Sequence, residues 1–467
     1  MILLAHSYFL AHDPKQQARS KPYAPLATLL AAALLRERGH PVAFFDAMLA
    51  DGVDAFEAML DRVRPRVVGI LEDNFNYITK MCTERNREAT VRMVGLAHER
   101  GCRVVVNGSD SADRPALYLA AGADAVLLGE AEMGMLELAD AWRADAEAPL
   151  GGIAGLVLPA RRGDVVRTPP RPAVRDLDAL PTPAWDLVDA AAYRAVWMPA
   201  HARLSWNMVT SRGCPYGCNW CAKPVFGRRY TQRSPAAVAM EMRRLKDQVG
   251  PEHVWFADDI FGLTAEWIAE FAAQVERLDA RIPFMMQSRV NLMRPTVVQA
   301  LARAGAEEVW LGVESGSQKI LDAMDKGTTV AQARAATRAL QAEGIRACWF
   351  VQLGYPSETW QDVLSTRDLI RAERPDDIGV SVSYPLPGTR FHEAVRAQLG
   401  AQHNWRDTDD LAMLFRGTYT TPFYRRLRDV LHQEARTGAD DAAWAELEAD
   451  EPAHRSEAPL AAVACGD

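Results

Sequence analysis

The chain has 467 residues, of which 49% are hydrophobic, so it is long enough for several domains with large buried cores. Its formal net charge of -8 argues against nucleic acid as the main partner, because phosphate binding usually requires a basic surface. Seven cysteines, an odd number, do not indicate the disulfide framework of a secreted protein, and we expect a cytoplasmic location.

One apolar stretch near the start imitates a targeting signal. Ala24–Leu35 ("APLATLLAAALL") follows three basic residues, but it is too short to span a bilayer and no cleavage-like site follows it. We interpret this stretch as a buried amphipathic helix, and we expect no membrane span elsewhere in the chain.

Residues 1–150 alternate short apolar runs with helical patterns. This alternation predicts a parallel, doubly wound sheet of the Rossmann-like kind, whose ligands bind beyond the carboxyl ends of the strands. The expected strands are Ile2–Ala5, Val42–Phe45, Val67–Leu71, Arg103–Val106 and Ala125–Leu128. The expected helices are Leu26–Arg38, Val53–Arg62, Val91–Arg100 and Ala116–Ala121.

Residues 151–202 are rich in glycine and proline, which predicts a linker. Each proline disfavours helix at the residue before it, so most of this segment is expected to be extended. Within it, Leu156–Thr168 predicts a small hairpin that turns at residues 162–164.

Residues 203–395 begin a second alternation, with intervening helices such as Pro235–Lys246 and Ala331–Glu343. Its expected strands are Leu204–Thr210, His253–Ala257, Phe284–Gln287, Glu308–Val313, Ala347–Leu353 and Ile378–Ser383. Six such units predict a partial (β/α)6 barrel of the TIM type, in which chemistry occurs at the carboxyl ends of the strands. Residues 396–467 predict a small helical C-terminal region that ends in an acidic, mobile tail from about Thr437. The fold class is therefore α/β.

Three of the seven cysteines lie in "GCPYGCNWC", residues 213–221, directly after the first strand of the second alternation. Thiolates from one short loop can converge on one metal centre. Three of them suit a four-iron cluster in which one iron keeps an open position. Structural zinc is the rival, but no fourth ligand lies nearby, since His201 precedes the strand. Three core cysteines without a metal are the remaining alternative.

The spacing CxxxCxxC, with an aromatic residue before the last cysteine, resembles the radical S-adenosylmethionine (SAM) superfamily. Further stretches at the expected strand ends resemble, in order, relatives that carry a cobalamin-binding domain. They are "WFADDIF" (255–261), "QSRV" (287–290), "LGVESGS" (311–317), "VQLGYPSET" (351–359) and "SYPLPGT" (383–389). The resemblance implies that Cys214, Cys218 and Cys221 hold a [4Fe-4S] cluster and that SAM chelates its unique iron.

The resemblance also implies a SAM site at these strand ends, formed by Trp220, Asp258, Asp259, Arg289, Glu314 and Gly354. Glu314 or Asp258 can accept hydrogen bonds from the SAM amino group or ribose, and Arg289 can pair with its carboxylate. Gly354 lets the backbone approach the ligand closely, and Trp220 would form an apolar wall beside the cluster. Helix capping for the acidic residues, or a structural ion pair for Arg289, is the competing interpretation.

The first 150 residues lack the GxGxxG turn of a dinucleotide site. Instead, Lys21–Ala47 and Val106–Glu132 resemble the cobalamin-binding domains of radical SAM enzymes. The expected cobalamin contacts are Asn107, Gly108, Ser109, Gly129, Glu130 and Tyr77. Leu96 stands where a DxHxxG motif would have aspartate, so we predict no histidine on cobalt. The loop from Glu72 to Tyr77 would approach the open face, unless that loop is purely structural.

These resemblances imply a cobalamin-dependent radical SAM enzyme. Its activity would be methyl transfer from methylcobalamin to an unactivated carbon, after hydrogen abstraction by the 5'-deoxyadenosyl radical. The alternative keeps the same cofactors but performs cyclisation, ring contraction or hydration, as in the anaerobic magnesium-protoporphyrin cyclase type. The expected partners are a small-molecule substrate of natural-product, lipid or tetrapyrrole type and an electron donor such as flavodoxin or ferredoxin. A cobalamin sensor without catalysis and a zinc-stabilised interaction module are the competing functions of other classes.

Overall fold

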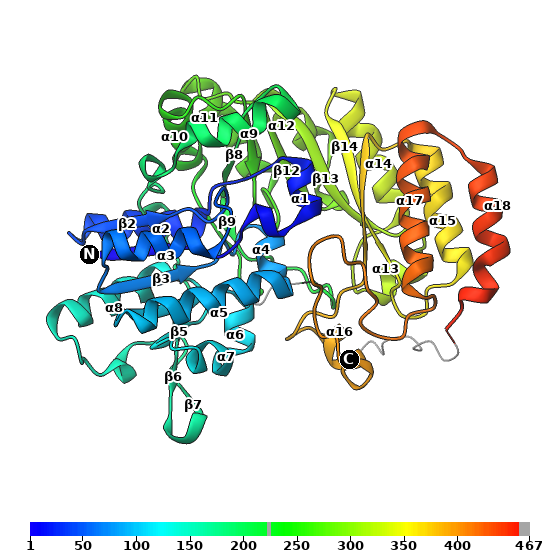
Figure 1. The fold of residues 1–467 in the computed structure, drawn as a ribbon. Coiled ribbons are helices and arrows are strands. Elements are labelled where there is room, and N and C mark those ends of the chain that lie inside the picture. The colour runs from blue at the N-terminus through cyan, green and yellow to red at the C-terminus, as the bar shows by residue number, and fades with distance from the viewer. Residues whose placement is uncertain (222–225, 457–467) are drawn as a thin grey trace.

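The first sheet is built from the N-terminal part of the chain (Figure 1). The computed structural model describes residues 1–221 and 226–456. The first sheet has the order β2-β1-β3-β4-β5-β6-β7, with β1 to β5 parallel. Its strands are β1 (Ile2–Ala5), β2 (Val42–Phe45), β3 (Val67–Leu71), β4 (Arg103–Asn107), β5 (Ala125–Leu127), β6 (Leu156–Pro159) and β7 (Val165–Arg167).

Helices cover both faces of the first sheet. Side chains alternate along β1, so Leu3 and Ala5 pack in one core and Ile2 and Leu4 in the other. Burial on both faces explains why these strands are continuous apolar runs. One face carries α2 (Leu26–Glu37) and α8 (Glu132–Ala144). The other carries α3 (Val53–Val63), α5 (Glu84–Glu99) and α7 (Pro115–Ala120). The shorter helices of this part are α1 (Pro14–Arg19), α4 (Tyr77–Met81) and α6 (Ser109–Asp113).

The hairpin of β6 and β7 belongs to the first sheet. We expected it inside a linker, but β6 pairs antiparallel with β5 through Val126 and Leu127. Leu156 and Val157 are fully buried there, so the pairing adds apolar core as well as backbone hydrogen bonds. The rest of the segment includes α9 (Ala190–His201), a helix that the linker prediction did not contain.

The second sheet is entirely parallel and runs in chain order, β8-β11-β12-β13-β14-β15. Its strands are β8 (Ser205–Met208), β11 (His253–Phe256), β12 (Phe284–Ser288), β13 (Ala306–Glu314), β14 (Arg346–Leu353) and β15 (Asp377–Val382). Its helices are α10 (Pro235–Gln248), α11 (Ala265–Arg277), α12 (Pro295–Ala304), α13 (Gln318–Ala323), α14 (Val330–Ala342) and α15 (Trp360–Glu373). All six carboxyl ends therefore lie at one edge. The α/β class is confirmed.

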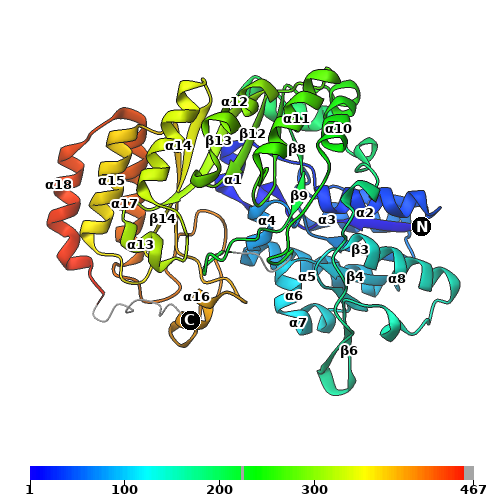
Figure 2. The ribbon, with the colours of Figure 1, turned by 180° about the vertical axis from the view of Figure 1, so that it is seen from behind.

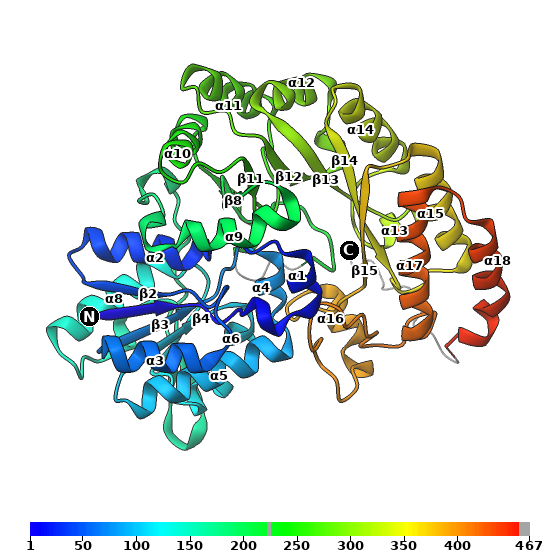
Figure 3. The same cartoon turned by 45° about the horizontal axis from the view of Figure 1, so that its top comes forward.

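A segment of the N-terminal part packs against the second sheet. Tyr23 shares a hydrogen bond of 3.1 Å with Ser205 of β8, and Asn207 donates to the Ala24 carbonyl at 2.8 Å. The indole of Trp197 on α9 donates to the Pro22 carbonyl at 2.8 Å. In Figure 3, α1 lies next to α4, where the two sheets meet. Residues 22–24 thus connect the two sheets.

The C-terminal region is more ordered than its composition indicates. α16 (Arg390–Val395) precedes this region, and its own α-helices are α17 (Thr421–Thr437) and α18 (Asp441–Asp450). A mobile tail from about Thr437 was expected, but α18 packs beside α15 and α17 at the outer edge of the molecule (Figures 1 and 2). Trp444 is buried there and donates to Glu434 at 2.8 Å, which holds α18 in place. The tail prediction for residues 457–467 lies outside the described residues.

No helix in the described ranges, 1–221 and 226–456, has both the length and the apolarity needed to cross a membrane.

Candidate functional site

The cysteine loop begins from a two-stranded ribbon beyond the end of β8. β9 (Ser211–Arg212) and β10 (Thr231–Gln232) pair antiparallel and bring the two ends of the loop together. Gly213 has φ +78°, and a Cβ there would lie 2.0 Å from the Arg229 carbonyl oxygen. Only glycine fits this turn. The loop leaves Cys214 buried and Cys218 and Cys221 partly exposed.

Two cations lie beside the cysteine loop. Arg289, which follows β12, donates from Nη1 to Cys218 Sγ at 3.4 Å, and its guanidinium lies 3.8 Å from the ring centre of Tyr216. It also donates to the Lys326 carbonyl. Burial opposes the charge of Lys326, but the Glu314 carboxylate and the Cys218 sulfur raise the pKa of Lys326. Two cations therefore lie where they can offset the negative charge of a thiolate-bound cluster.

Glu314 completes this cluster at the end of β13. Its carboxylate lies 2.6 Å from Lys326 Nζ, and both side chains are buried. Glu314 has φ +64°, an uncommon conformation for a residue with a side chain, next to a bulge in β13. A Cβ at Gly312 would lie 2.5 Å from Lys326 Nζ. The backbone is therefore shaped to bring a carboxylate and an ammonium group beside the cysteines.

Asn219, between the second and third cysteines, anchors the loop to the second sheet's helices, a role that the sequence reasoning missed. Its backbone N donates to the Met324 carbonyl at 3.1 Å, and its side chain donates to the Ala323 carbonyl at 2.8 Å. Tyr355 donates to its Oδ1 at 3.0 Å. Its position between two cysteines was the only available signal, because all these partners lie more than 100 residues away.

Trp220 packs where the sequence predicts an apolar wall. Its ring lies against the small core that contains Ile320 and Phe391. Lys326 Nζ is 5.8 Å from the ring centre, within the range of a cation–π contact. The buried Nε1 of Trp220 has no hydrogen-bond partner in the described ranges, 1–221 and 226–456. Its N–H could therefore donate to a bound ligand.

The two aspartates after β11 have different partners. Asp258 is buried and accepts hydrogen bonds from the Thr210 backbone N at 3.0 Å and the Ser211 hydroxyl at 2.5 Å. Burial raises the pKa of Asp258 to about 6, against the effect of these hydrogen bonds. Asp259 instead pairs with Lys80 of α4 at 2.7 Å. Asp258 thus fixes the backbone that leads into the cysteine loop. Asp259 links the second sheet to α4 of the N-terminal part.

Gly354 ends β14 in a left-handed turn, with φ +74°. Its backbone N donates to Glu358 at 2.7 Å, and a Cβ would lie 2.9 Å from Met413 Cε. Burial raises the pKa of Glu358 to about 8. The turn requires glycine for its backbone conformation and for the close approach of Met413.

The expected cobalamin residues lie at the carboxyl edge of the first sheet. Asn107 donates to the carbonyls of Leu127 and Gly129, both at 3.0 Å, and accepts from Asn74 at 2.9 Å. These bonds tie together the loops after β3, β4 and β5. Gly129 has φ +72°, and a Cβ at Gly108 would lie 2.9 Å from Glu72 Cγ.

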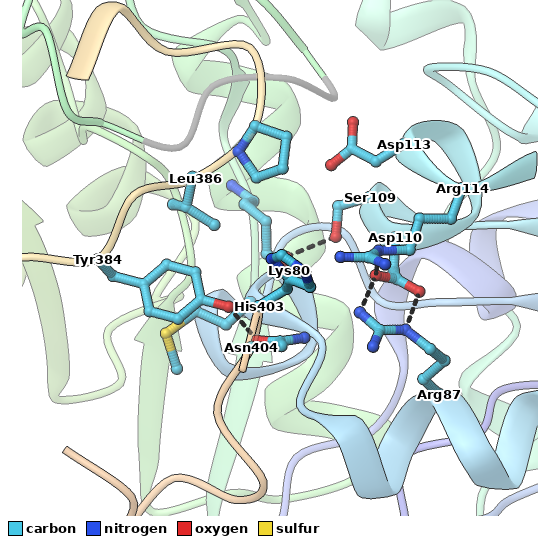
Figure 4. A pocket seen from close by; sticks show the side chains of 12 residues that line it. Lys80, Arg87, Ser109, Asp110, Asp113, Arg114, Tyr384, Leu386, His403 and Asn404 are labelled. Carbon is cyan, nitrogen blue, oxygen red and sulfur yellow. Dashed lines mark hydrogen bonds and ion pairs between the residues drawn. The ribbon is translucent and has the colours of Figure 1, made fainter. Parts of the chain in front are cut away.

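Figure 4 shows where this edge meets the segments that follow β15 of the second sheet. The Ser109 hydroxyl donates to the Lys80 carbonyl at 2.5 Å. Asp110 accepts two bonds from Arg87, at 2.8 and 2.6 Å. Tyr384, beyond β15, donates to Asn404 from the opposite side. Tyr77, by contrast, is 45% exposed and lies at the start of α4.

Arg212 joins the cysteine loop to the carboxyl edge of the first sheet. No motif in the sequence pointed to it. It lies in β9 directly before the cysteine loop, is buried, and pairs with Glu130 at 2.9 Å and Glu132 at 2.7 Å. Its guanidinium also lies 5.6 Å from the Phe75 ring centre. Glu130 further accepts a hydrogen bond from the Val174 backbone N at 2.6 Å.

The residues present fit an iron–sulfur cluster and a large ligand. As the side chains stand in the described part of the chain, no three His, Cys, Asp or Glu are grouped to hold a metal ion. The donor set nevertheless has the right chemistry, since three thiols of one loop lie beside two cations that offset the charge of thiolates and sulfides. At the first sheet, Gly129 and Glu130 line an open hollow of about 650 Å³ together with residues 170–173 and 226–229.

Residues 208–370 match the Radical SAM superfamily, and these residues contain the cysteine loop and the strand ends just described. Over 387 residues the chain is 29% identical to an uncharacterized methyltransferase of Pyrococcus horikoshii, covering 82% of this chain and 81% of that protein.

Two further similarities concern a cyclase and a solved structure. Over 271 residues the chain is 29% identical to the anaerobic magnesium-protoporphyrin IX monomethyl ester cyclase of Rubrivivax gelatinosus, covering 56% of this chain but only 47% of the cyclase. The fold resembles that of the radical SAM methyltransferase TsrM from Kitasatospora setae, solved with cobalamin and a [4Fe-4S] cluster. That likeness has a TM-score of 0.67 and 21% identity, and covers 82% of this chain and 71% of TsrM.

Proposed function

We propose that the chain is a cobalamin-dependent radical SAM methyltransferase that acts on an unactivated carbon of a small molecule. One observation carries the proposal: the cysteine loop and the carboxyl edge of the first sheet are joined by the buried contacts of Arg212 with Glu130 and Glu132. A radical at one site and a methyl group at the other can react only when such contacts fix their separation. The similarity to methyltransferases supports this function.

In this proposal the first sheet is a Rossmann-like cobalamin domain and the second a partial (β/α)6 barrel of the radical SAM type. The boundaries are those of the sequence, 1–150, 151–202, 203–395 and 396–467, with the hairpin of β6 and β7 completing the first sheet. Asn107, Gly108, Ser109, Gly129 and Glu130 would contact cobalamin. Tyr77 remains a proposed contact because it lies exposed at the end of the loop after β3.

Cys214, Cys218 and Cys221 would hold the cluster. When bound, the cluster would supply the electron that cleaves SAM, and cobalamin would supply the methyl group. Arg289 would bind the SAM carboxylate and Glu314 its amino group, and Trp220 would form an apolar wall. Gly354 allows close approach, and Asp258 and Asp259 position the loop and the sheet junction. A ferredoxin or flavodoxin would deliver the electron.

The test uses anaerobically reconstituted protein with a chemical reductant, such as dithionite, and SAM carrying a labelled methyl group. We expect iron and sulfide binding, SAM cleavage to 5'-deoxyadenosine, and transfer of label to cobalamin. Cys218→Ala should abolish cluster absorption and cleavage, whereas Cys102→Ala, a buried cysteine of the first sheet, should retain both. Zinc without iron or sulfide in the wild-type protein would overturn the proposal.

The similarity to the cyclase supports one alternative, a radical reaction without methyl transfer. It predicts 5'-deoxyadenosine formation in the same assay but no label on cobalamin or product. A methyltransferase should give 5'-deoxyadenosine and also transfer the label. Transfer of the label therefore distinguishes the two functions.

A further inference from the structure

A cavity of about 490 Å³ lies between the two sheets. On one side it is lined by Tyr8, Met48 and Tyr77, which follow β1, β2 and β3 at the carboxyl edge of the first sheet. On the other side it is lined by residues of β11 to β15 in the second sheet. Its volume is within the usual range for small-molecule sites. A molecule held there would contact residues of both sheets.

Aromatic side chains form much of the wall on the second sheet. Trp310 and Phe350 stack with ring centres 4.9 Å apart and both line the cavity. Trp255 lines it as well, and its ring lies 4.7 Å from that of Tyr23. Met285 adds a flexible side chain that adapts to ligand shape. These surfaces favour an apolar, planar molecular body.

Three cations line the cavity. Arg19, Lys21 and Arg436 all line it, and within the described ranges none has a carboxylate at ion-pair distance. The acidic residues of the lining are Glu308, which pairs with Arg346, and Asp377. The lining therefore carries more positive than negative charge.

A neutral polar group lies beside these cations. His432 of α17 lines the cavity, and its Nδ1 is buried without a hydrogen-bond partner in the described part of the chain. Burial lowers the pKa of His432 to about 4, so its ring is neutral at pH 7 and can donate or accept one hydrogen bond there. An unpaired buried polar atom is costly unless a ligand or water satisfies it.

We propose that this cavity binds the substrate, and that the substrate is an anion: an apolar, planar body held by the aromatic wall, with a carboxylate or phosphate group at Arg19, Lys21 and Arg436. That the bound molecule is the substrate rests on the proposed function. That the cavity binds an anion of this shape is argued from the lining residues alone. An uncharged lipid would leave these three cations without a counter-ion.

The test compares two probes that differ only in charge, 1-naphthaleneacetate and the neutral 1-naphthaleneacetamide. Equilibrium dialysis against cluster- and cobalamin-loaded protein, without reductant, measures each affinity. The wild-type protein should bind the carboxylate at least about tenfold more tightly than the amide. Inorganic phosphate should compete with the carboxylate if phosphate esters are accepted as well. Equal affinity for the two probes would overturn the proposal.

Variants locate the binding. The double variant Arg19→Gln/Arg436→Gln should lose the preference for the carboxylate while still binding the amide. Arg38→Gln, an exposed arginine at the end of α2 outside the lining, should keep it. Gly379→Leu, which adds a side chain beside Trp310, should weaken both probes, and Met285→Trp serves the same purpose if the first variant fails to fold. A preference unchanged in the double variant would contradict the proposal.

Failure of this inference is distinguishable from failure of the proposed function. SAM cleavage by the wild-type protein without added substrate tests the proposed function alone, because it requires no anion in the cavity. If the wild-type protein shows no charge preference yet cleaves SAM, only the substrate class is wrong. If it prefers the carboxylate but binds no cluster, the function is wrong and the anion site stands.

Discussion

Arg212 Nη2 lies 2.7 Å from Glu132 Oε1, and both side chains are buried. The two residues come from different parts of the fold, 80 positions apart in the chain. This pair fixes the cysteine loop relative to the carboxyl edge of the first sheet more directly than any apolar contact could, because a buried ion pair tolerates little displacement.

Replacing Arg212 with alanine should destabilise the protein by about 3–5 kcal/mol, because Glu130 and Glu132 would remain buried without a cation. Chemical unfolding measures the loss. The matched control is Arg92→Ala, which breaks an exposed pair with Asp54 and should cost less than about 1 kcal/mol. Similar losses for the two variants would show that the Arg212 contacts are not the main link between the sheets.

Gly213→Ala should disrupt the cysteine loop. The left-handed backbone alone costs about 1–3 kcal/mol for alanine, and the added Cβ would collide with the Arg229 carbonyl. We expect less iron per chain after reconstitution and a lower unfolding temperature. Gly217 lies in the same loop, and a Cβ there would have no atom of the described residues within 4 Å, so Gly217→Ala should bind iron normally.

Asn219→Ala should lower iron retention with a smaller effect on global stability. The side chain holds the loop between Ala323 and Tyr355, both outside the cysteine motif. Dialysis of reconstituted protein against a chelator, followed by iron analysis, measures retention. Gln17→Ala on the exposed side of α1 is the control, and equal iron loss from both variants would refute the anchoring role.

Glu358 predicts a pH dependence of stability. Its folded-state pKa of about 8 exceeds the usual glutamate value of 4.5, so between these values the folded state holds a proton that the unfolded chain has released. The free energy of unfolding should therefore fall as pH rises from about 4.5 to about 8. Glu358→Gln keeps an acceptor for the Gly354 N–H but cannot ionise, so the fall should become shallower. Glu343→Gln, at an exposed position after α14, should leave it unchanged.

Strands could be predicted closely from the sequence where both of their faces are buried. All five expected strands of the first sheet and all six of the second are present, because continuous apolar runs between turns have few other solutions. The β9–β10 ribbon was missed, since two residues per strand show no periodicity. The attachment of β6 to β5 was missed because pairing partners are not encoded locally.

The candidate site could likewise be predicted where its residues form local motifs, and not where they depend on distant partners. The cysteines and the strand-end residues came from motifs that are contiguous in the chain. Arg212, Asn219 and Lys326 did not, since their importance depends on partners from distant elements. Likewise, α18 was expected to be mobile from its acidic composition, but the buried face of Trp444 outweighs that composition.

The bond between Tyr23 and Ser205 spans 182 positions, and this has a consequence during synthesis. The residues around Tyr23 leave the ribosome long before β8 is synthesised. Their aromatic surface is therefore exposed to solvent while most of the first sheet folds. A chain that is stopped before β8 would keep that surface exposed and be prone to aggregate. Attempts to produce the N-terminal half as a separate protein should therefore include residues through β8, or replace Tyr23 with a polar residue.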